Sequence, residues 1–208
     1  MCYINSVTNV LIIMTIHTKQ IIMSEAKTLF ALNGYEGFTM RNLAKESGVG
    51  LSSIYHFFKD KDVLLKYIFD DVSKQLGVER SKLAKRQIAS QMLYDRIVFQ
   101  FNHIEEVVYV LKYYLHFRKE FLKLDSGYIP SKAYLHVDEV LRFGVKTSEF
   151  EFIESEIEQE AKVIAHAING FLLEYYPETP TKSELQKVSL IIHRFLIRSL
   201  TNKEVGMK

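Results

Sequence analysis

The chain contains a single cysteine, Cys2, so it cannot form an internal disulfide. Structural disulfides belong to oxidising compartments, and a chain without one is typical of a reducing compartment; we therefore predict a cytoplasmic location. Long apolar runs are also missing at the start of the chain. The run from Val10 to Met14 is too short to cross a bilayer, and no lysine or arginine precedes it as in a signal peptide. We expect neither a signal nor a membrane anchor.

Proline is scarce as well, and the three that occur, Pro130, Pro177 and Pro180, all lie at suspected breaks between helical segments. Apolar residues recur at helical spacing between these breaks, and no alternating strand pattern of convincing length is found. With 208 residues, of which 48% are hydrophobic, the chain can bury a substantial core in one or two domains. The predicted fold class is all-α.

The chain shows no pattern of a catalytic or metal site. Its seven histidines are scattered without cysteine or carboxylate partners at metal-ligand spacing, and neither a His-Glu-x-x-His motif nor a phosphate-binding loop occurs. We therefore predict that the protein is not an enzyme and that it binds no metal and no cofactor. The net charge of +2 gives no general sign of nucleic-acid binding either. Any such function must depend on a local pattern.

Residues 39–65 carry a pattern of two short helices around a tight turn, followed at once by a third helix. Thr39 can cap the first helix with its side-chain oxygen. Gly48 tolerates the left-handed backbone that a sharp turn demands, and Val49 supplies an apolar plug between the helices. In the second helix Ile54 and Phe58 share one apolar face. The remaining side chains form a small polar surface that can enter a major groove.

This run, together with the apolar face of the helix before it, resembles the helix-turn-helix of the TetR/AcrR family of transcriptional regulators over residues 20–66. The stretch from Ile54 to Leu65 looks like the family's signature run from the recognition helix into helix four. Two positions depart from the family pattern, because Gly50 stands where a capping serine is usual and Ser52 where glycine is frequent. The resemblance implies a sequence-specific DNA-binding regulator, a repressor that binds a palindromic operator as a homodimer and is released by a ligand.

The resemblance also implies which residues contact double-stranded DNA. The resemblance assigns phosphate anchoring to Thr39, Arg41, Tyr55 and Lys61, and base reading to Leu51, Ser52, Ser53 and His56. The full predicted set is Thr39, Arg41, Leu51, Ser52, Ser53, Tyr55, His56, Lys59 and Lys61. Four of these have another interpretation: Thr39 can be a helix cap alone, Tyr55 can pack under the first helix, and Leu51 and His56 can be buried. Asp60 is a good cap for the next helix, so the Lys61 ammonium and the free amides of that helix could hold one phosphate.

We divide the chain into a leader or flexible arm over residues 1–17, a helix-turn-helix DNA-binding domain over 18–62, and a helical ligand-sensing and dimerisation domain over 63–208. In the last part we expect a linking helix ended near Gly77, helices over 81–101 and 103–123 with Asn102 capping the second, and a helix over 131–143. The stretch from Gly144 to Phe150 resembles the connection that precedes the last two helices in many family members.

The last two helices carry apolar stripes, and the second begins with a capping box of Thr181 and Glu184. A monomer core could use the same stripes, but the family pairing of two such helices from each subunit favours a dimer. Small residues such as Ala167 and Gly170 would let another helix approach closely. The dimer-interface candidates are Ile157, Ala161, Ile164, Ile168, Val188, Ile192 and Phe195.

Between these regions lies an aromatic-rich stretch that could line an apolar pocket with a few polar tips, which suits a small-molecule effector of apolar or aromatic character. Core packing is the alternative for each residue. The ligand-pocket candidates are Tyr109, Tyr113, Tyr114, His116, Phe117, Phe121, Tyr134 and Phe143. The remaining alternative for the whole chain is a dimeric helical module that binds small molecules or proteins without reading DNA.

Overall fold

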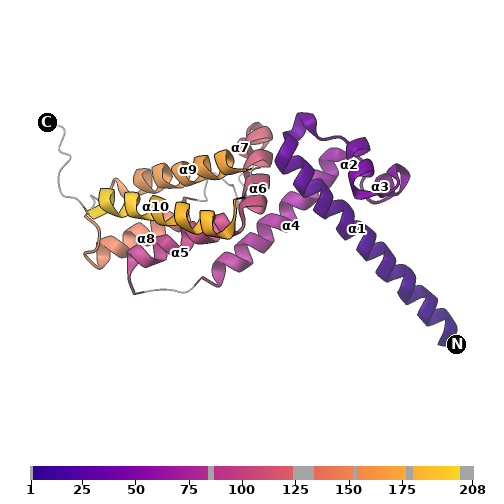
Figure 1. The fold of residues 1–208 in the computed structure, drawn as a ribbon, viewed down its shortest axis with the longest axis horizontal. Coiled ribbons are helices and arrows are strands. Elements are labelled where there is room, and N and C mark those ends of the chain that lie inside the picture. The colour runs from indigo at the N-terminus through magenta and orange to yellow at the C-terminus, as the bar shows by residue number, and fades with distance from the viewer. Residues whose placement is uncertain (1, 84–86, 124–133, 152–153, 177–179, 202–208) are drawn as a thin grey trace. The chain divides into compact units, whose positions relative to one another are not determined.

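The computed structural model describes residues 2–83, 87–123, 134–151, 154–176 and 180–201, with side chains from residue 10 onward. All regular structure in these residues is helical, which confirms the all-α prediction (Figure 1). The helices are α1 (Cys2–Gly37), α2 (Met40–Ser47), α3 (Leu51–Phe57), α4 (Lys61–Ser81), α5 (Ala89–Asn102), α6 (Ile104–His116), α7 (Arg118–Lys123), α8 (Leu135–Lys146), α9 (Ile157–Tyr175) and α10 (Lys182–Thr201). The chain forms two compact units, Met1–Gln75 and Leu76–Lys208, so the division falls inside α4.

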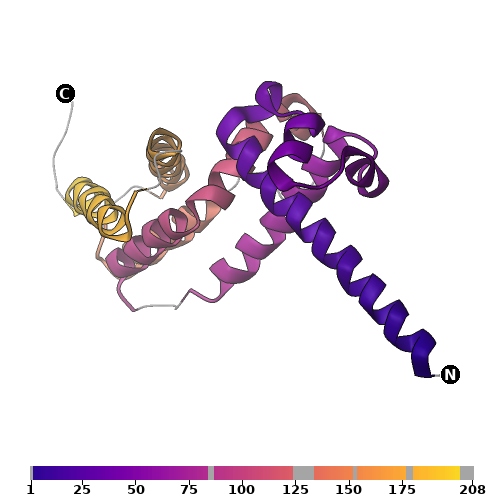
Figure 2. The same cartoon turned by 45° about the vertical axis from the view of Figure 1, so that its right-hand side comes forward.

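The first unit is built on α1, α2, α3 and the first part of α4. Its core is formed by side chains of all four helices, including the fully buried Phe30, Leu43, Ile54 and Leu64. The backbone of α1 is kinked at Gly34, which has a φ of 67°. Its earlier part extends past the other helices of the unit (Figure 2). The run Val10–Met14 therefore belongs to a helix, and its side chains are more than half exposed.

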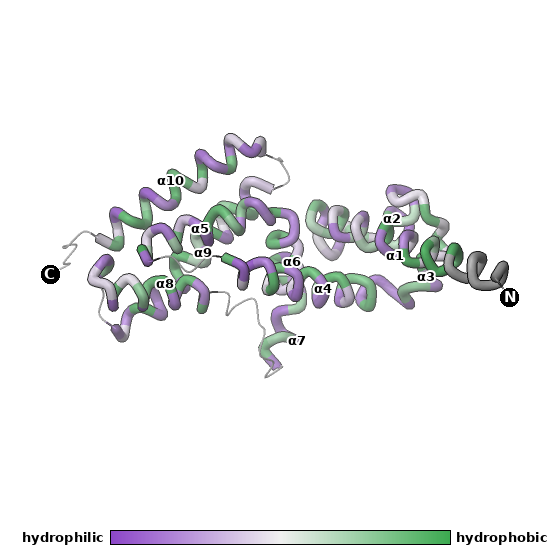
Figure 3. Tube along the Cα trace, turned by 90° about the horizontal axis from the view of Figure 1, so that it is seen from below, coloured by the Kyte–Doolittle hydropathy of each residue, from purple (hydrophilic) through white to green (hydrophobic). Residues whose placement is uncertain are grey.

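The second unit is a bundle in which α5 packs between α10 and α8, α8 packs on α9, and α9 packs on α6. Apolar and polar residues follow one another in turn along α10 (Figure 3). The helix can therefore place an apolar face against α5 and a polar face in solvent. None of the helices in the described ranges combines the length and the apolar character that a membrane span requires.

Several predicted boundaries in this unit are wrong. Helix α4 continues through Gly77 to Ser81, where the glycine lies in open surroundings, and a single exposed glycine costs a helix only about 1 kcal/mol. Asn102 does not cap α6, because it is the last residue of α5 and His103 takes the cap position. Helix α5 begins eight residues later than expected. The carboxylate of Glu149 accepts hydrogen bonds from the backbone N–H groups of Ala89 and Ser90, at 2.8 and 3.3 Å, and so caps α5 from a distant part of the chain.

The predicted helix over 103–123 is also interrupted, because α6 ends at His116 and α7 begins at Arg118. The change of direction lets Phe121 pack against Tyr113 and Tyr114, with ring centroids 6.1 and 5.6 Å apart. Burial of these aromatic rings offsets the loss of one continuous helix. Of the predicted helix over 131–143, the first three residues lie outside the described residues, and α8 extends beyond it to Lys146.

In the connection after α8, the ring of Phe150 packs closely against the backbone of Gly144. A Cβ atom at this position would collide with the ring of Phe150, which packs directly on the glycine and is itself buried. The backbone of Ser148 in the same turn has a positive φ of 60°. The later capping box is confirmed, since Thr181 N–H donates to Glu184 Oε2 at 2.7 Å and Glu184 N–H donates to Thr181 Oγ1 at 3.3 Å.

The apolar stripes predicted for a dimer interface mostly face the core of the subunit itself. Five of the seven candidates, Ile157, Ala161, Ile164, Ile168 and Ile192, are between 0 and 5% exposed and cannot be buried further by a partner. Val188 is half-buried and Phe195 is 69% exposed. The prediction is therefore wrong for the five buried residues. The reason is that periodicity shows that a helix has an apolar face but not what covers it.

Candidate nucleic-acid interface and effector cavity

The turn between α2 and α3 is held by local hydrogen bonds. Thr39 caps α2, its Oγ1 accepting from Asn42 N–H at 3.1 Å. At the other end Gly48 adopts a φ of 68°, the left-handed conformation that glycine takes without steric cost. The hydroxyl of Ser47 donates to the Leu43 carbonyl at 2.6 Å and accepts from Val49 N–H at 3.2 Å. The cap and the glycine turn are thus as the sequence predicts, and Ser47 is an additional link.

Helix α3 presents a polar surface to solvent. Ile54 is fully buried and Phe58, just after the helix, is 3% exposed, so both anchor the helix to the unit. Ser52, Ser53 and His56 are exposed, and Tyr55 is 49% exposed. The alternatives in which Tyr55 packs under α1 or His56 is buried are therefore wrong. Leu51 is half-buried, which leaves part of its side chain at the surface beside the serines.

The start of α4 shows a role for Lys61 that sequence reasoning missed. Asp60 caps this helix, because its Oδ1 accepts from Val63 N–H at 2.9 Å. The Lys61 ammonium donates to the carbonyl of Tyr35 at 3.3 Å and lies 3.7 Å from the centre of the Tyr35 ring. Lys61 therefore ties α4 to the end of α1. An ammonium has three donors, so the remaining ones can still meet a phosphate.

The Tyr35 side chain makes a second contact between α1 and the start of α4. Its hydroxyl donates to Asp62 Oδ1 at 2.6 Å. Burial, followed by the hydrogen bond and negative charge of Asp62, raises the pKa of Tyr35 to about 12, so the hydroxyl stays protonated as a donor. Lys61 was read from the sequence as a phosphate contact alone. Its contact with Tyr35, 26 residues away, carries no local sequence signal.

The other predicted phosphate contacts, Arg41 and Lys59, have exposed side chains. A further cation belongs to the same unit: Lys19 lies 4.0 Å from the centre of the Tyr67 ring and 5.7 Å from that of Phe58. Such cation–π contacts orient the long side chain. The unit therefore carries its predicted DNA-contacting groups at the surface, except that Lys61 and Leu51 are half-buried.

The aromatic residues predicted to line a pocket pack mainly on one another. Tyr109, Tyr113 and Phe121 are at most 7% exposed, and the centroid of the Tyr113 ring is 4.6 Å from that of Phe117. Tyr134 donates through its hydroxyl to Glu158 Oε1 at 3.1 Å. Of the eight candidates, Tyr114 borders a cavity of about 470 Å³, beside Leu115 and Leu173. The other seven candidates do not line that cavity or the cavity around Arg96, which is described next. They are Tyr109, Tyr113, His116, Phe117, Phe121, Tyr134 and Phe143.

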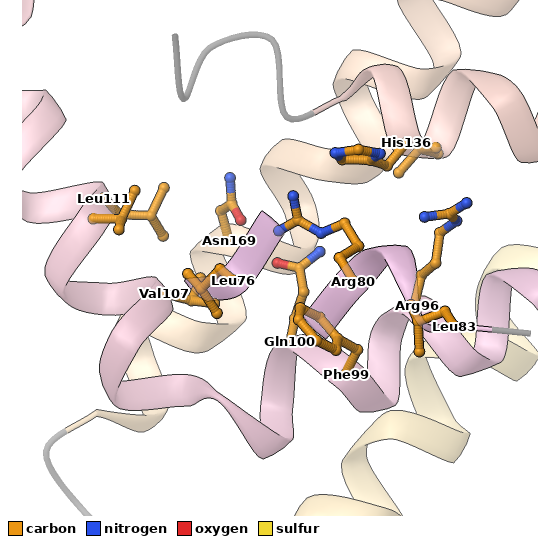
Figure 4. Close-up of a pocket in the computed structure, with 12 residues that line it drawn as sticks. Leu76, Arg80, Leu83, Arg96, Phe99, Gln100, Val107, Leu111, His136 and Asn169 are labelled. Carbon is orange, nitrogen blue, oxygen red and sulfur yellow. The ribbon is translucent and has the colours of Figure 1, made fainter. Parts of the chain in front are cut away.

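A different set of residues surrounds the cavity at the centre of the second unit. It is lined by residues at the end of α4 and by α5, α6, α8 and α9, and its volume is about 40 Å³. Arg80, Arg96 and His136 point into one region of it, and Val107 and Leu111 lie toward the opposite end (Figure 4). Sequence reasoning missed this site. The available signal was Arg96, which stands between Leu93 and Ile97 on the apolar face of α5.

Among the residues that the structure describes, no group of three histidine, cysteine, aspartate or glutamate side chains is placed to hold a metal ion.

Comparison with known proteins agrees with this geometry. Residues 22–68 match the family described as "Bacterial regulatory proteins, tetR family". A probable HTH-type transcriptional regulator of Bacillus subtilis, YttP, is 29% identical over 97 residues, which is 43% of this chain and 47% of that protein. The HTH-type transcriptional repressor AcnR of Corynebacterium efficiens is 29% identical over 80 residues, or 38% of this chain and 43% of that protein. The chain thus matches less than half the length of these curated relatives.

The fold is similar over a longer span. A TetR-family transcriptional regulator from Agrobacterium tumefaciens covers 90% of this chain and 100% of its own, with a TM-score of 0.66 and 15% sequence identity. At this identity the likeness concerns the fold alone. The family match covers the helix-turn-helix region, and the likeness of fold extends to the helical second unit.

Proposed function

We propose that this chain is a sequence-specific DNA-binding transcriptional regulator that binds a palindromic operator as a homodimer. The observation that carries the proposal is the exposed polar surface of α3. The buried side chains of Ile54 and Phe58 anchor the opposite face of the helix in the core of the first unit. Small hydroxyl side chains and an imidazole at this position can reach base edges in a major groove. Seen as a protein-contact surface, the same face lacks the apolar core that stable interfaces bury.

The contacts to DNA divide into two kinds. Ser52, Ser53 and His56 would read base edges, and the exposed part of Leu51 would meet a thymine methyl group. Thr39, Arg41, Tyr55, Lys59 and Lys61 would hold phosphates and so set the register of α3 on the duplex. Thr39 can do so while it caps α2, because a hydroxyl can donate and accept at once.

Dimerisation would use the exposed faces of α9 and α10 in place of the buried stripes. On α9, Val163 is 63% exposed and Phe171 46%, and at the exposed Gly170 an added Cβ would meet nothing within 4 Å. On α10, Ile191 is 60% exposed and Phe195 69%. Clustered large apolar side chains in water mark interaction surfaces. A two-fold dimer would place two α3 helices about 34 Å apart, one turn of the duplex.

Regulation would be repression relieved by a small molecule. The name of AcnR, a transcriptional repressor, supports repression as the mode. Release requires that the effector bind more tightly to an arrangement of the dimer that does not fit DNA, and linkage then requires DNA to weaken effector binding by the same factor. Helix α4 is the natural element to transmit the change, because it begins at Lys61 beside α3 and ends at Ser81 in the second unit.

The proposal is tested by selection from a random duplex DNA library with the purified full-length protein, without added ligand. We expect enrichment of a palindrome with half-sites about one helical turn apart, and an affinity that falls steeply with salt as counterions are released. If nothing is enriched even after the protein has been unfolded and refolded to remove a co-purified ligand, the proposal fails. The chain would then be a helical binding module without sequence-specific recognition of DNA.

A further inference from the structure

The central cavity of the second unit has an apolar part and a cationic part. Its apolar walls come from Leu76, Val107, Val110, Leu111 and Val137. At the other end, Arg80, Leu83, Arg96 and His136 also border an outer cavity of about 290 Å³. A cavity of about 40 Å³ holds a few waters or a small ligand group, since one water needs roughly 10–15 Å³. The cationic groups therefore stand at the junction of a small inner space and a larger outer one.

The positive charges at this junction are only partly balanced by the described residues. Two guanidinium groups, Arg80 and Arg96, face the same space, and Arg80 also lies over the ring of Phe99 at 5.5 Å. For Arg96 the described residues give one ion pair, with Glu139 at 3.5 Å, and the Glu139 side chain is 68% exposed. The Arg96 side chain is only 17% exposed. A solvated carboxylate at that distance compensates one of the two cations only in part.

Arg96 also has an unsatisfied hydrogen-bond donor. Its Nε is buried and, among the described residues, finds no acceptor. Burial, with a contribution from the positive charge of Arg80, lowers the pKa of Arg96, and the Glu139 carboxylate opposes this. An unpaired buried donor on a charged group costs more than an ordinary lost hydrogen bond. A buried donor of this kind calls for an explanation, and an acceptor supplied by a bound ion is one.

The neighbouring imidazole is suited to the same purpose. Burial, followed by repulsion from Arg80 and Arg96, lowers the pKa of His136 to about 4. The ring is therefore neutral near pH 7 and offers one N–H donor and one acceptor. Gln100 and Asn169 add uncharged amide groups to the walls. The site thus presents two cations and several neutral donors beside an apolar surface, a combination that favours a compact anion.

We propose that this cavity binds an organic carboxylate, with the carboxylate oxygens between Arg80 and Arg96 and a short apolar group toward Leu76, Val107 and Leu111. A guanidinium fork matches the two oxygens of a carboxylate, and the Nε–H of Arg96 gains an acceptor. This class of ligand differs from the apolar or aromatic effector that the aromatic-rich sequence suggests. That the carboxylate is the effector rests on the proposed regulatory function, whereas its binding does not.

The position of the site gives a small ligand a route by which to act on the first unit through α4. Arg80 belongs to the last turn of α4, and Arg96 and His136 belong to α5 and α8. A carboxylate between the arginines would fix the end of α4 against these two helices. Without it, the mutual repulsion of Arg80 and Arg96 favours their separation. Ligand binding therefore changes the relative stability of two positions of the α4 end.

The test is calorimetric titration of DNA-free, full-length protein in a buffer that contains no carboxylate. The probes are butyrate, hexanoate and octanoate, each compared with the alcohol and the alkylammonium ion of the same chain length. Because each charged hydrogen bond lost weakens binding by roughly tenfold or more, we expect at least one carboxylate to bind at least about tenfold more tightly than its alcohol, and the ammonium ions to bind least. Equal affinity for acid and alcohol, tighter binding of the ammonium ion, or no binding by any carboxylate would overturn the proposal.

Variants distinguish a binding role from a structural one. Arg96→Gln and Arg80→Gln should each weaken carboxylate binding by roughly tenfold, and the exposed Arg198→Gln on α10 is the matched control that should not. In the absence of ligand, Arg96→Gln should melt no lower than the native protein, because it removes a repulsive and unsatisfied group. A lower melting temperature with unchanged carboxylate affinity would show that Arg96 is structural and overturn the proposal. If Arg96→Gln does not fold, Arg80→Gln gives the same comparison at a half-buried position.

A parallel titration with the selected duplex separates the two proposals. Carboxylate binding by a protein that does not bind DNA would support the site and reject the regulatory function. DNA binding by a protein that takes up none of the carboxylates would do the reverse. If both bind, the preferred carboxylate should weaken DNA binding, and Arg96→Gln should reduce that effect.

Discussion

The two units of this protein differ in how their structure is specified. In the first unit, the turn between α2 and α3 depends on groups close together in the chain: the Thr39 cap, the left-handed Gly48 and the Ser47 hydroxyl. In the second unit, the cap of α5 comes from Glu149, sixty residues away, and the cationic cavity joins α4, α5 and α8. Local contacts can be read from one sequence, whereas distant ones require the fold.

The same difference separates the two kinds of site. The proposed DNA-contacting surface lies largely on one short helix, so its exposed residues follow from the position of two buried anchors, Ile54 and Phe58. The proposed carboxylate cavity gathers Arg80, Arg96 and His136 from three helices whose packing order is not evident from periodicity. The comparison teaches that the proposed DNA-contacting surface is specified locally in this chain, whereas the proposed ligand cavity is specified by packing.

The sharpest way to break this comparison is a pair of neighbouring substitutions on α10. Ile192 is 5% exposed and Ile191 is 60% exposed. Ile192→Asp places an unpaired carboxylate in the subunit core and should lower the free energy of unfolding by about 4 kcal/mol or more. Ile191→Asp should leave each subunit folded but weaken the dimer. Urea unfolding would measure the loss of stability, and sedimentation would measure the loss of the dimer. Equal loss of stability in both variants would contradict the assignment of Ile192 to the buried face of α10 and of Ile191 to its exposed face.

A second prediction concerns the close approach after α8. Gly144→Ala inserts a methyl group against the Phe150 ring, and overpacking of this kind should cost about 2 kcal/mol of unfolding free energy. Gly77→Ala in α4 is the matched control, since its Cβ meets nothing, and it should be neutral or stabilising by about 0.5 to 1 kcal/mol. Urea denaturation distinguishes them. Similar stability of the two variants would mean that Phe150 does not pack on Gly144.

A third prediction uses the pH dependence of stability. The pKa of His136 is about 4 in the folded protein and 6.5 when unfolded. Above pH 6.5 the imidazole is neutral in both states; between 6.5 and 4 only the unfolded state takes up the proton, so stability falls as pH decreases. Between pH 6.5 and 5 the native protein should lose roughly 1 to 2 kcal/mol more than His136→Gln. Parallel pH curves for the two proteins would show that His136 does not lie in this cationic environment.

A smaller effect distinguishes the two capped helices. Thr39→Ala and Thr181→Ala each remove a cap and should each cost about 1 kcal/mol. Only Thr39→Ala should also weaken DNA binding, because Thr181 lies at the start of α10 in the second unit. Thr39→Ser keeps the hydroxyl and should restore both properties. Fluorescence anisotropy with the selected duplex would measure this, and equal DNA affinity for the two alanine variants would remove Thr39 from the interface.

The sequence predicted the all-α fold, the α2-turn-α3 element and the caps at Thr39, Asp60 and Thr181, because each depends on residues within a few positions of one another. It also predicted apolar stripes on α9 and α10, but assigned the buried Ile164 and Ile168 to an interface. The start of α5 was missed because its cap, Glu149, lies sixty residues away. The break between α6 and α7 was missed because it depends on how Phe121 packs against Tyr113. Arg96 was missed because a charged residue on an apolar face is ordinarily read as an interruption of the core.

The most direct test of the central claim, that α3 reads base sequence, is selection from the same random duplex library with the native protein and with His56→Ala. The imidazole is exposed, so its removal should leave the stability of the unit unchanged. The account predicts that both proteins enrich a palindrome with the same spacing, and that the variant loses preference at one base position repeated symmetrically in both half-sites. An identical base preference for the two proteins would contradict the assignment of His56. If Ser53→Ala also left the motif unchanged, α3 would not be the element that reads DNA.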